Sequence, residues 1–468
     1  KAYADMGGKI EMTTFHELAP EPRNDIKTYM RMGYTLPSAI SDIIDNSISA
    51  KSSTIEIWAS YRDGNPHLNI CDDGVGMSKD ELVENMRIAC KNPNDDRVKG
   101  DLGRFGSGMK TASFSQARKF TVVTKKQGQP IIAAIWDVDV IEESNSWRLQ
   151  VLEENELDDL PLKKLTNTSQ SGTEIIWENL SFINSGDHSE NYQEQLDSRL
   201  EEVRSHVALY FHRFMSGAGR VTFLINNSPV TPIDPFLSTY KGYQEGQFEY
   251  FREKSGKVEI QGHILPFIHQ LSEPELREDE NIKALGGVKT IIQKQGMYVY
   301  REKRLIIEGG WLGLSRPSQL QGLARVQVDI PSTFDDEWKT DVKKETLDIP
   351  EKVRRKIKKF LSEPRKKSEN THRPRVEKQR ENDYWSYEED SRTRRYAYLI
   401  NKENKALRDL IMRIQPNERR NLTSYLENLS KNIPVYSIWA NYSKDRNDYL
   451  EIGKSDWFES LLEEVGNS

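Results

Sequence analysis

Three short segments carry side chains whose types and order could together hold a nucleotide and a metal ion. The first, Asp42-Ile43-Ile44-Asp45-Asn46, places two carboxylates and an amide at i, i+3 and i+4, so one face of a helix presents all three. An amide oxygen suits a hard Mg²⁺ ion that keeps several waters and shares phosphate oxygens. Asn46 is therefore the candidate metal ligand. Asp42, one turn earlier, is the candidate group that polarises or orients an attacking water.

The second segment, Asp72-Asp73-Gly74-Val75-Gly76-Met77, ends an apolar strand with acids and continues into a glycine turn. A buried carboxylate at Asp72 can accept a hydrogen bond from the exocyclic amine of adenine, and the wrong base would leave a group unsatisfied. The glycines let the backbone approach a ligand closely. The candidate nucleotide-binding residues of this segment are Asp72, Gly74, Gly76 and Met77.

The third segment is rich in glycine and opens onto a helix, whose first backbone N–H groups can bind phosphate. Lys110 could add a point charge. The candidate phosphate-binding residues are Gly103, Arg104, Phe105, Gly106, Ser107, Gly108, Met109 and Lys110. The segment is neither a Walker A loop nor a Rossmann fingerprint, because the required spacings are absent.

Each segment alone also fits a plainer role: a polar helix face, an Asp-Gly turn, or a glycine-rich surface loop. Their order within about 70 residues favours one shared pocket for a metal, a purine and a triphosphate.

Hydrophobic periodicity predicts the elements that must position these residues, and the result is an α/β fold with helices layered on a mixed sheet. The expected helices are Pro37–Ala50, Lys79–Ala89 and Phe105–Gln116, and the expected strands are Thr54–Ser60, His67–Cys71, Lys119–Thr124, Ile131–Asp137 and Thr173–Trp177. A long helix, Gln193–Met215, leads into a second α/β unit. Its expected strands are Val221–Ile225, Val258–Ile264, Met297–Arg301 and Ala324–Asp329.

Composition narrows the class of protein. The 468 residues suffice for about three domains, and 36% hydrophobic with 30% charged residues suits a protein with real cores. No apolar run approaches the roughly 20 residues that span a bilayer, so no membrane partner is expected. Cys71 and Cys90 cannot build a disulfide framework, which favours a reducing, cytoplasmic setting. The net charge is −6, yet residues 352–380 hold 13 Lys or Arg against 3 Glu, which indicates a polyanionic partner.

The three segments resemble the N, G1 and G2 boxes of the GHKL ATPases, which include gyrase B, ninety-kilodalton heat-shock chaperones, histidine kinases, MutL and MORC proteins. The resemblance covers roughly residues 30–180 and implies a Bergerat-type α/β sandwich that binds ATP and Mg²⁺. It implies that Asn46 holds the metal, that Asp72 reads adenine, and that residues 92–108 form the ATP lid. Ser171-Gly172-Thr173 resembles the later Gly-Thr element, with Thr173 close to the adenine.

The chain departs from this family at the catalytic position. ATPases of the group usually carry Glu there, and this chain carries Asp42, which is shorter by one methylene. Because small misplacements cost rate, we expect slow turnover. Asp45, one turn on, could share the role, although the family pattern aligns it beside the metal-binding Asn.

Two later stretches, Gly296–Ile306 and Trp338–Lys344, resemble the transducer domain of bacterial MORC-type ATPases. Transducers of this branch send a lysine to the γ-phosphate, and Lys339 is the first candidate and Lys343 the second. Both also fit solvated lysines at a strand end. The expected segments are an N-terminal arm (1–30), the ATPase domain (31–190), an S5-like transducer (191–350), a basic helix with a charged linker (351–395) and a helical C-terminal region (396–468).

The expected function is an ATP-gated clamp or switch. ATP binding would order the lid and join two copies as a homodimer, and residues 352–380 would contact DNA phosphates without reading bases. A bacterial restriction-like or anti-phage setting and an effector protein such as a nuclease are the expected context and partner. Two alternatives stay open: an interaction module with negligible hydrolysis that recruits an effector, and a chaperone-like ATPase.

Overall fold

The computed structural model describes residues 21–62, 65–88, 108–165, 171–183, 192–253, 256–267, 279–335, 338, 349–372, 384–390 and 395–432. The chain divides into two units, Lys1–His372 and Arg373–Ser468. Within the described residues, no helix is both long and apolar enough to cross a membrane.

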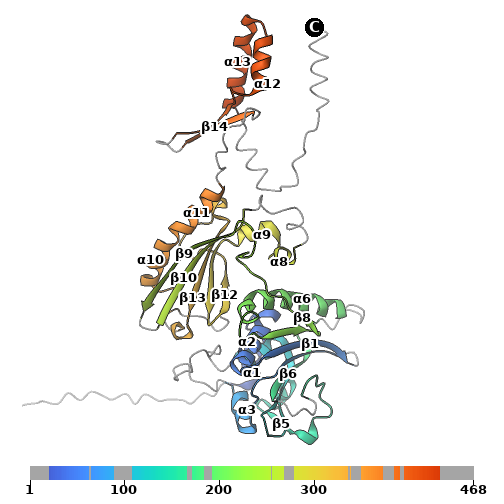
Figure 1. Cartoon of the computed structure of the whole chain (residues 1–468). Coiled ribbons are helices and arrows are strands. Elements are labelled where there is room, and N and C mark those ends of the chain that lie inside the picture. Colours follow the sequence, from blue (N-terminus) through green and yellow to red (C-terminus); the bar gives the residue numbers. More distant parts are fainter. Residues whose placement is uncertain are drawn as a thin grey trace, which may run out of the picture. The chain divides into compact units, whose positions relative to one another are not determined.

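The first unit begins with an eight-stranded sheet in the order β5-β4-β3-β6-β2-β1-β7-β8 (Figure 1). Its strands are β1 (Thr54–Arg62), β2 (Asn65–Asp72), β3 (Ala117–Lys125), β4 (Ile132–Asp137), β5 (Gln150–Glu153), β6 (Gly172–Leu180), β7 (Thr222–Ile225) and β8 (Ser228–Pro229). Neighbouring strands run antiparallel except β1 and β7, which are parallel. The sequence predicted most of these strands within a few residues, and the α/β class is confirmed.

Helices pack on the sheet through one large apolar core that includes Ile43, Phe114, Phe120 and Trp177. The helices are α1 (Pro22–Met30), α2 (Leu36–Ser49), α3 (Lys79–Met86), α4 (Gly108–Gln116), α5 (Val138–Ser144) and α6 (Tyr192–Tyr210), with short 3-10 turns η1 (Glu154–Glu156) and η2 (His212–Phe214). Val123, Ile131, Ala133, Leu157, Leu165 and Ile176 form a smaller, separate core.

Helix α2 forms where the sequence supplies both a cap and an apolar stripe. Thr35 is its N-cap, and its side chain accepts a hydrogen bond from the Ser38 amide at 3.3 Å. In return, the Ser38 hydroxyl accepts from the Thr35 amide at 3.0 Å, which completes a capping box. Pro37 occupies the first turn, where its missing N–H costs nothing. These caps fix where the helix begins. Its isoleucines Ile40, Ile43 and Ile44 then lie in the core, and the position of Asp42 and Asp45 is fixed with them.

The strand expected at Val221–Ile225 does not belong to the second sheet, and that placement was wrong. β7 lies beside β1 in the first sheet, with Thr222 opposite Thr54. Helix α6 connects β6 to β7, and Val203 and Val207 of α6 are part of the first core. Sequence spacing showed a strand after a long helix but not which sheet it joins.

A second, five-stranded sheet of the first unit has the order β12-β11-β13-β10-β9. Its strands are β9 (Gln244–Glu253), β10 (Gly256–Ile264), β11 (Gly296–Arg301), β12 (Arg304–Glu308) and β13 (Ala324–Ile330). Its helices and 3-10 turns are α8 (Glu280–Ala284), α9 (Gly287–Gln293), η4 (Gln319–Gln321), η5 (Ser332–Phe334), α10 (Glu351–Phe360) and α11 (Ser362–His372). Figure 1 shows α10 and α11 alongside the sheet, and Val353, Ile357 and Phe360 of α10 are buried in its core.

The sequence predicted one basic helix followed by a charged linker within residues 351–395, but residues 362–372 form a second helix, α11. The Ser368 hydroxyl donates to the Leu320 carbonyl at 2.8 Å, and Arg365 donates to the Gln321 side chain at 2.8 Å. The polar composition that suggested a linker therefore supplies side-chain contacts to η4.

The second unit holds a hairpin of β14 (Trp385–Asp390) and β15 (Arg395–Ile400), then α12 (Lys405–Arg413) and α13 (Pro416–Lys431). The helical region predicted over residues 396–468 is confirmed for α12 and α13, wrong for the strand β15 before them, and lies outside the described residues from 433 onward. Asn404 caps α12, because its side chain accepts from the Leu407 amide at 3.0 Å. The run before it alternates aromatic and aliphatic residues, which favours a strand.

Candidate functional site

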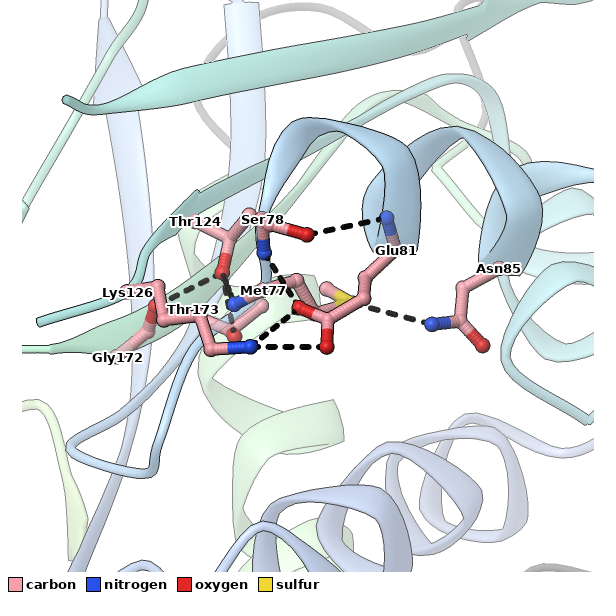
Figure 2. A network of polar contacts seen from close by, with 8 residues as sticks. All are labelled: Met77, Ser78, Glu81, Asn85, Thr124, Lys126, Gly172 and Thr173. Carbon is pink, nitrogen blue, oxygen red and sulfur yellow. Dashed lines mark hydrogen bonds and ion pairs between the residues drawn. The ribbon is translucent and has the colours of Figure 1, made fainter. Parts of the chain in front are cut away.

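Three polar side chains lie in one row across neighbouring strands of the first sheet. Asp72 of β2 pairs in register with Thr173 of β6, and Thr173 pairs with Thr124 of β3. The Thr124 and Thr173 hydroxyls lie 3.1 Å apart, and the Met77 amide donates to Thr124 at 3.0 Å (Figure 2). The strands therefore place a carboxylate and two hydroxyls beside each other at one end of the sheet. This polar row offers the hydrogen-bonding groups that the edge of a purine ring requires.

Asp72 is held between the sheet and helix α2. The Ser47 hydroxyl donates to Asp72 Oδ2 at 2.8 Å, and the Gly74 amide donates to Oδ1 at 2.9 Å. Burial raises the pKa of the Asp72 carboxyl, against the opposing effect of these hydrogen bonds. Each carboxylate oxygen has more than one lone pair, so a further N–H donor such as an adenine amine can be accepted.

Asp73, the neighbouring acid, has a structural role. Its Oδ1 accepts from the Ser53 amide at 2.7 Å and the Thr54 amide at 2.9 Å, and the Ser53 hydroxyl donates to Oδ2 at 2.5 Å. These bonds outweigh partial burial and lower the pKa of Asp73. Asp73 thus anchors the start of β1, and only Asp72 belongs to the polar row.

Glycines let the turn after β2 lie against its neighbours. Gly76 has a φ of +65°, and a Cβ built there would lie 1.9 Å from the Lys125 carbonyl oxygen. A Cβ at Gly172 would lie 2.3 Å from the Asp72 carbonyl oxygen. Gly74 is similarly enclosed by Ala50 and Ser52. These close approaches keep the Met77 amide within reach of Thr124.

Helix α3 is fixed beside this turn. Ser78 and Glu81 form a capping box, and Lys126 donates to both Glu81 oxygens at 2.9 and 2.8 Å (Figure 2). The lysine contact, with help from Ser78, lowers the pKa of Glu81 to about 2. The Asn85 amide contacts the Met77 sulfur at 3.5 Å, which joins the far end of α3 to the same turn.

The acidic face of α2 lies near this row. Asp42 and Asp45 are buried, with 5% and 1% of their surfaces exposed. Asn46 is the one exposed residue of α2, all of which is described. Within the described residues, the side-chain amide of Asn46 forms no hydrogen bond. Its oxygen is therefore available to an ion, whereas both carboxylates are enclosed.

Sequence reasoning missed two partners of these carboxylates. The Tyr34 hydroxyl donates to Asp42 Oδ2 at 3.0 Å. Arg304, from β12 in the second sheet, forms a buried ion pair with Asp45, and its Nη1 lies 3.8 Å from Asp42 Oδ1. Arg304 lies in the stretch Gly296–Ile306, which resembles a transducer domain, but the spacing of that stretch does not predict a contact with α2.

Helix α4 brings its glycine start to Asp42. A Cβ built on Gly108 would lie 3.2 Å from Asp42 Oδ2, a tight contact that would require this carboxylate to move by a few tenths of an ångström. Met109 is partly buried against the first core. Lys110 is buried, and its ammonium donates at 2.5 Å to the Asn85 carbonyl at the end of α3, where a cation is favoured. A phosphate contact for Lys110 stays a prediction.

Several predicted site residues lie outside the described residues. These are Gly103, Arg104, Phe105, Gly106 and Ser107 of the expected lid, and the two candidate lysines, Lys339 and Lys343. The part of the chain that is described contains no cluster of three or more His, Cys, Asp or Glu side chains that could hold a metal by itself. A Mg²⁺ ion at Asn46 would need oxygens from phosphate and water, which is the usual arrangement for this ion.

Comparison with known proteins agrees with this geometry. Residues 34–173 match the family described as histidine kinase-, DNA gyrase B- and HSP90-like ATPases. That range begins at the Tyr34 contact to Asp42 and ends at Thr173 in the polar row.

Individual relatives match over shorter stretches. "ATPase morc-1" of Caenorhabditis elegans is 30% identical over 98 residues, which is 21% of this chain and 11% of the relative. "ATPase MORC2B" of Mus musculus is 29% identical over 92 residues, which is 19% and 9%. "Chaperone protein HtpG" of Psychromonas ingrahamii is 31% identical over 96 residues, which is 18% and 15%. The chain thus spans less than a sixth of the length of these relatives.

Proposed function

Because this chain carries a GHKL ATPase domain over residues 34–173, we propose that it binds ATP and hydrolyses it slowly to ADP and phosphate. The observation that supports this most directly is the polar row of Asp72, Thr173 and Thr124 facing α2, the helix that also presents Asn46 and Asp42. One short helix thereby links a purine-reading edge to an acidic face suited to phosphate chemistry.

Each residue has a distinct part in this proposal. Asp72 accepts the adenine amine, and Thr173 hydrogen-bonds the same ring. Asn46 is the ligand that would hold Mg²⁺, which, when bound, neutralises phosphate charge. Asp42 orients the water that adds to the γ-phosphorus as the bond to the bridging oxygen breaks. Asp45 is paired with Arg304, so Asp42 is the better candidate for this role.

The test is single-turnover hydrolysis by wild type, Asp42→Asn and Asn46→Ala. We expect Asp42→Asn to lower the rate by roughly 10²–10⁴-fold, since it removes a general base, while affinity for a nonhydrolysable ATP analogue stays near wild type. Asn46→Ala should weaken the dependence of affinity on Mg²⁺. Asp73→Asn is the matched control, because Asp73 anchors β1. Equal rates for wild type and Asp42→Asn would remove Asp42 from the chemistry.

We further propose that ATP joins two copies into a clamp on DNA, with helix α10 and the start of α11 at the contact. The structure narrows the cations that could serve. Lys352 and Lys356 both pair with Glu253, and Arg354 donates to the Leu312 carbonyl. Among the described residues of α10 and α11, the exposed cations without an ion-pair or hydrogen-bond partner are Lys358, Lys359 and Lys366.

The DNA proposal makes a measurable statement about salt. Because each phosphate contact releases counterions, removing one of these three lysines should weaken binding to duplexes of any sequence and reduce the slope of log K against log salt by roughly 1. Lys352→Ala is the matched control on the same helix, since its ammonium is already paired with Glu253. Binding that does not respond to salt would count against a DNA contact here.

A second candidate function is a nucleotide-dependent switch with negligible hydrolysis, which recruits an effector such as a nuclease in a cytoplasmic defence system. The observation in its favour is the Arg304 guanidinium beside Asp42, which competes with water for that carboxylate. Tight ATP binding without turnover would select this candidate. The likeness to HtpG suggests a third outcome, turnover that rises with an unfolded client protein.

A further inference from the structure

The turn between β11 and β12 brings two arginines together. It is a two-residue turn of Glu302 and Lys303, whose φ angles of 48° and 73° are both left-handed. This is the geometry of tight hairpins, although glycine or asparagine usually occupies it. Arg301 and Arg304 are directly opposite each other on either side of the turn.

Two like charges directly opposite each other on a hairpin repel, and these two are also buried. Each is balanced by its own carboxylate. Arg301 donates to Asp335 at 2.7 and 2.6 Å through two guanidinium nitrogens, and Arg304 pairs with Asp45. Both acids therefore stabilise the hairpin tip.

The two acids belong to different parts of the first unit. Asp45 lies on α2 in the ATPase domain. Asp335 directly follows η5, the 3-10 turn after β13 of the second sheet. The Glu302 carboxylate strengthens the second attachment, because it accepts from the Ser332 amide and hydroxyl, each at 2.9 Å. The tip thus connects the acidic face of α2 to the chain that leaves β13.

Arg304 reaches fully into the first core. Its guanidinium lies 5.3 Å from the centre of the Phe211 ring, and Tyr298, Tyr300 and Leu305 of its hairpin are members of the same core as α2. The pair with Asp45 is enclosed by protein on the side of the ATPase domain, so salt and water screen it weakly.

We propose that Arg304 is a positioning residue for the hydrolytic step, acting through Asp45. It neutralises the second acid of α2, so that Asp42 alone presents a carboxylate to the reacting phosphate. Without Arg304, two buried carboxylates one helical turn apart would repel each other, and α2 would shift or take up a compensating cation. The second sheet thereby sets the geometry of hydrolysis in the first.

This inference rests on the proposed ATPase function, and the experiment separates the two. Turnover, affinity for a nonhydrolysable ATP analogue and thermal stability are measured for wild type, Arg304→Gln, Arg304→Lys, and the double variant Asp45→Asn with Arg304→Gln. Glu308→Gln is the matched control, because Glu308 lies on β12 like Arg304 and the change also breaks an ion pair, the 2.7 Å contact with Lys294. If wild type neither binds nor hydrolyses ATP, the proposed function fails.

If wild type is active, we expect Arg304→Gln to lower kcat at least tenfold while analogue affinity changes less than threefold. Arg304→Lys should recover part of kcat, because it keeps a positive charge beside the Asp45 carboxylate. The kcat of the double variant should exceed that of Arg304→Gln, since it also removes the negative charge of Asp45 that Arg304 had balanced. Should Arg304→Gln not fold, Asp45→Asn is measured alone beside the double variant. If Arg304 acts through Asp45, the two have equal kcat, and a lower kcat in the double variant would overturn the inference. A folded Arg304→Gln with wild-type kcat, or a double variant no faster than the single one, would overturn the inference.

Discussion

Replacing Asp72 by Asn is the sharpest test of the purine edge, because the shape is kept and one acceptor is exchanged for a donor. Oδ1 accepts from the Gly74 amide at 2.9 Å, and Oδ2 accepts from the Ser47 hydroxyl at 2.8 Å. The Gly74 amide can only donate, so the Asn oxygen must occupy that side. The Asn amide nitrogen then points toward Ser47 and the pocket, where the adenine amine is also a donor.

The magnitude follows from the bond that is lost. A hydrogen bond to a charged group contributes about 1.5–3 kcal/mol, and the replacement leaves two donors facing each other. Since about 1.4 kcal/mol is a tenfold change, we expect ATP to bind roughly 10–100-fold more weakly to Asp72→Asn. A base with a carbonyl at that position, as in GTP, should lose far less affinity, so the preference for ATP over GTP should shrink or reverse.

The assay is isothermal calorimetry with nonhydrolysable analogues of ATP and GTP on wild type and Asp72→Asn. Asp73→Asn is the matched control: it makes the same chemical change one residue on, but the partners of Asp73 are Ser53 and Thr54 at the start of β1. The control should lose thermal stability and keep nucleotide preference. ATP affinity of folded Asp72→Asn within threefold of wild type, with an unchanged ratio to GTP, would refute the reading of Asp72 as the adenine acceptor.

Two further predictions concern stability. Burial lowers the pKa of His206 to about 3 and of His212 to about 4. Below pH 6.5, therefore, both histidines bind protons in the unfolded chain but stay neutral in the folded one. Stability from these groups is complete above pH 6.5, and urea denaturation should show it falling by about 1.4 kcal/mol per pH unit for each histidine down to about pH 4. Gly76→Ala should lower both melting temperature and ATP affinity, because its Cβ would meet the Lys125 carbonyl at 1.9 Å. Gly128→Ala, with a φ of +76° and open space, should cost only about 1–2 kcal/mol; equal losses for the two would refute the steric argument.

Local sequence signals predicted the elements of the site well. The capped helix α2, the strand ending at Asp72 and the helix opening at Gly108 each depend on residues within a few positions of one another. Such features are readable from periodicity and turn chemistry. Contacts between distant segments were not readable. Thr124 joins the site through a strand register, and Arg304 meets Asp45 across 259 residues of sequence.

Lys110 illustrates a different limit. A lysine two residues into a glycine-led helix is typical of a phosphate contact, but the direction of its side chain depends on which helix packs beside it. Here α3 ends beside α4, and the Asn85 carbonyl takes the ammonium. Composition predicts the charge, whereas tertiary packing decides what that charge meets.

The surroundings of Asp42 bear on why a short acid stands at this position. One oxygen accepts from Tyr34 and lies against Gly108, and the other faces Arg304. Such a carboxylate is held rigidly, and a Glu would need room that α4 already occupies. A water oriented by Asp42 must then approach from the phosphate side, after α2, α4 and β12 have taken their places. We therefore expect slow turnover, because in the proposed mechanism hydrolysis depends on the packing of the second sheet as well as on the bound nucleotide.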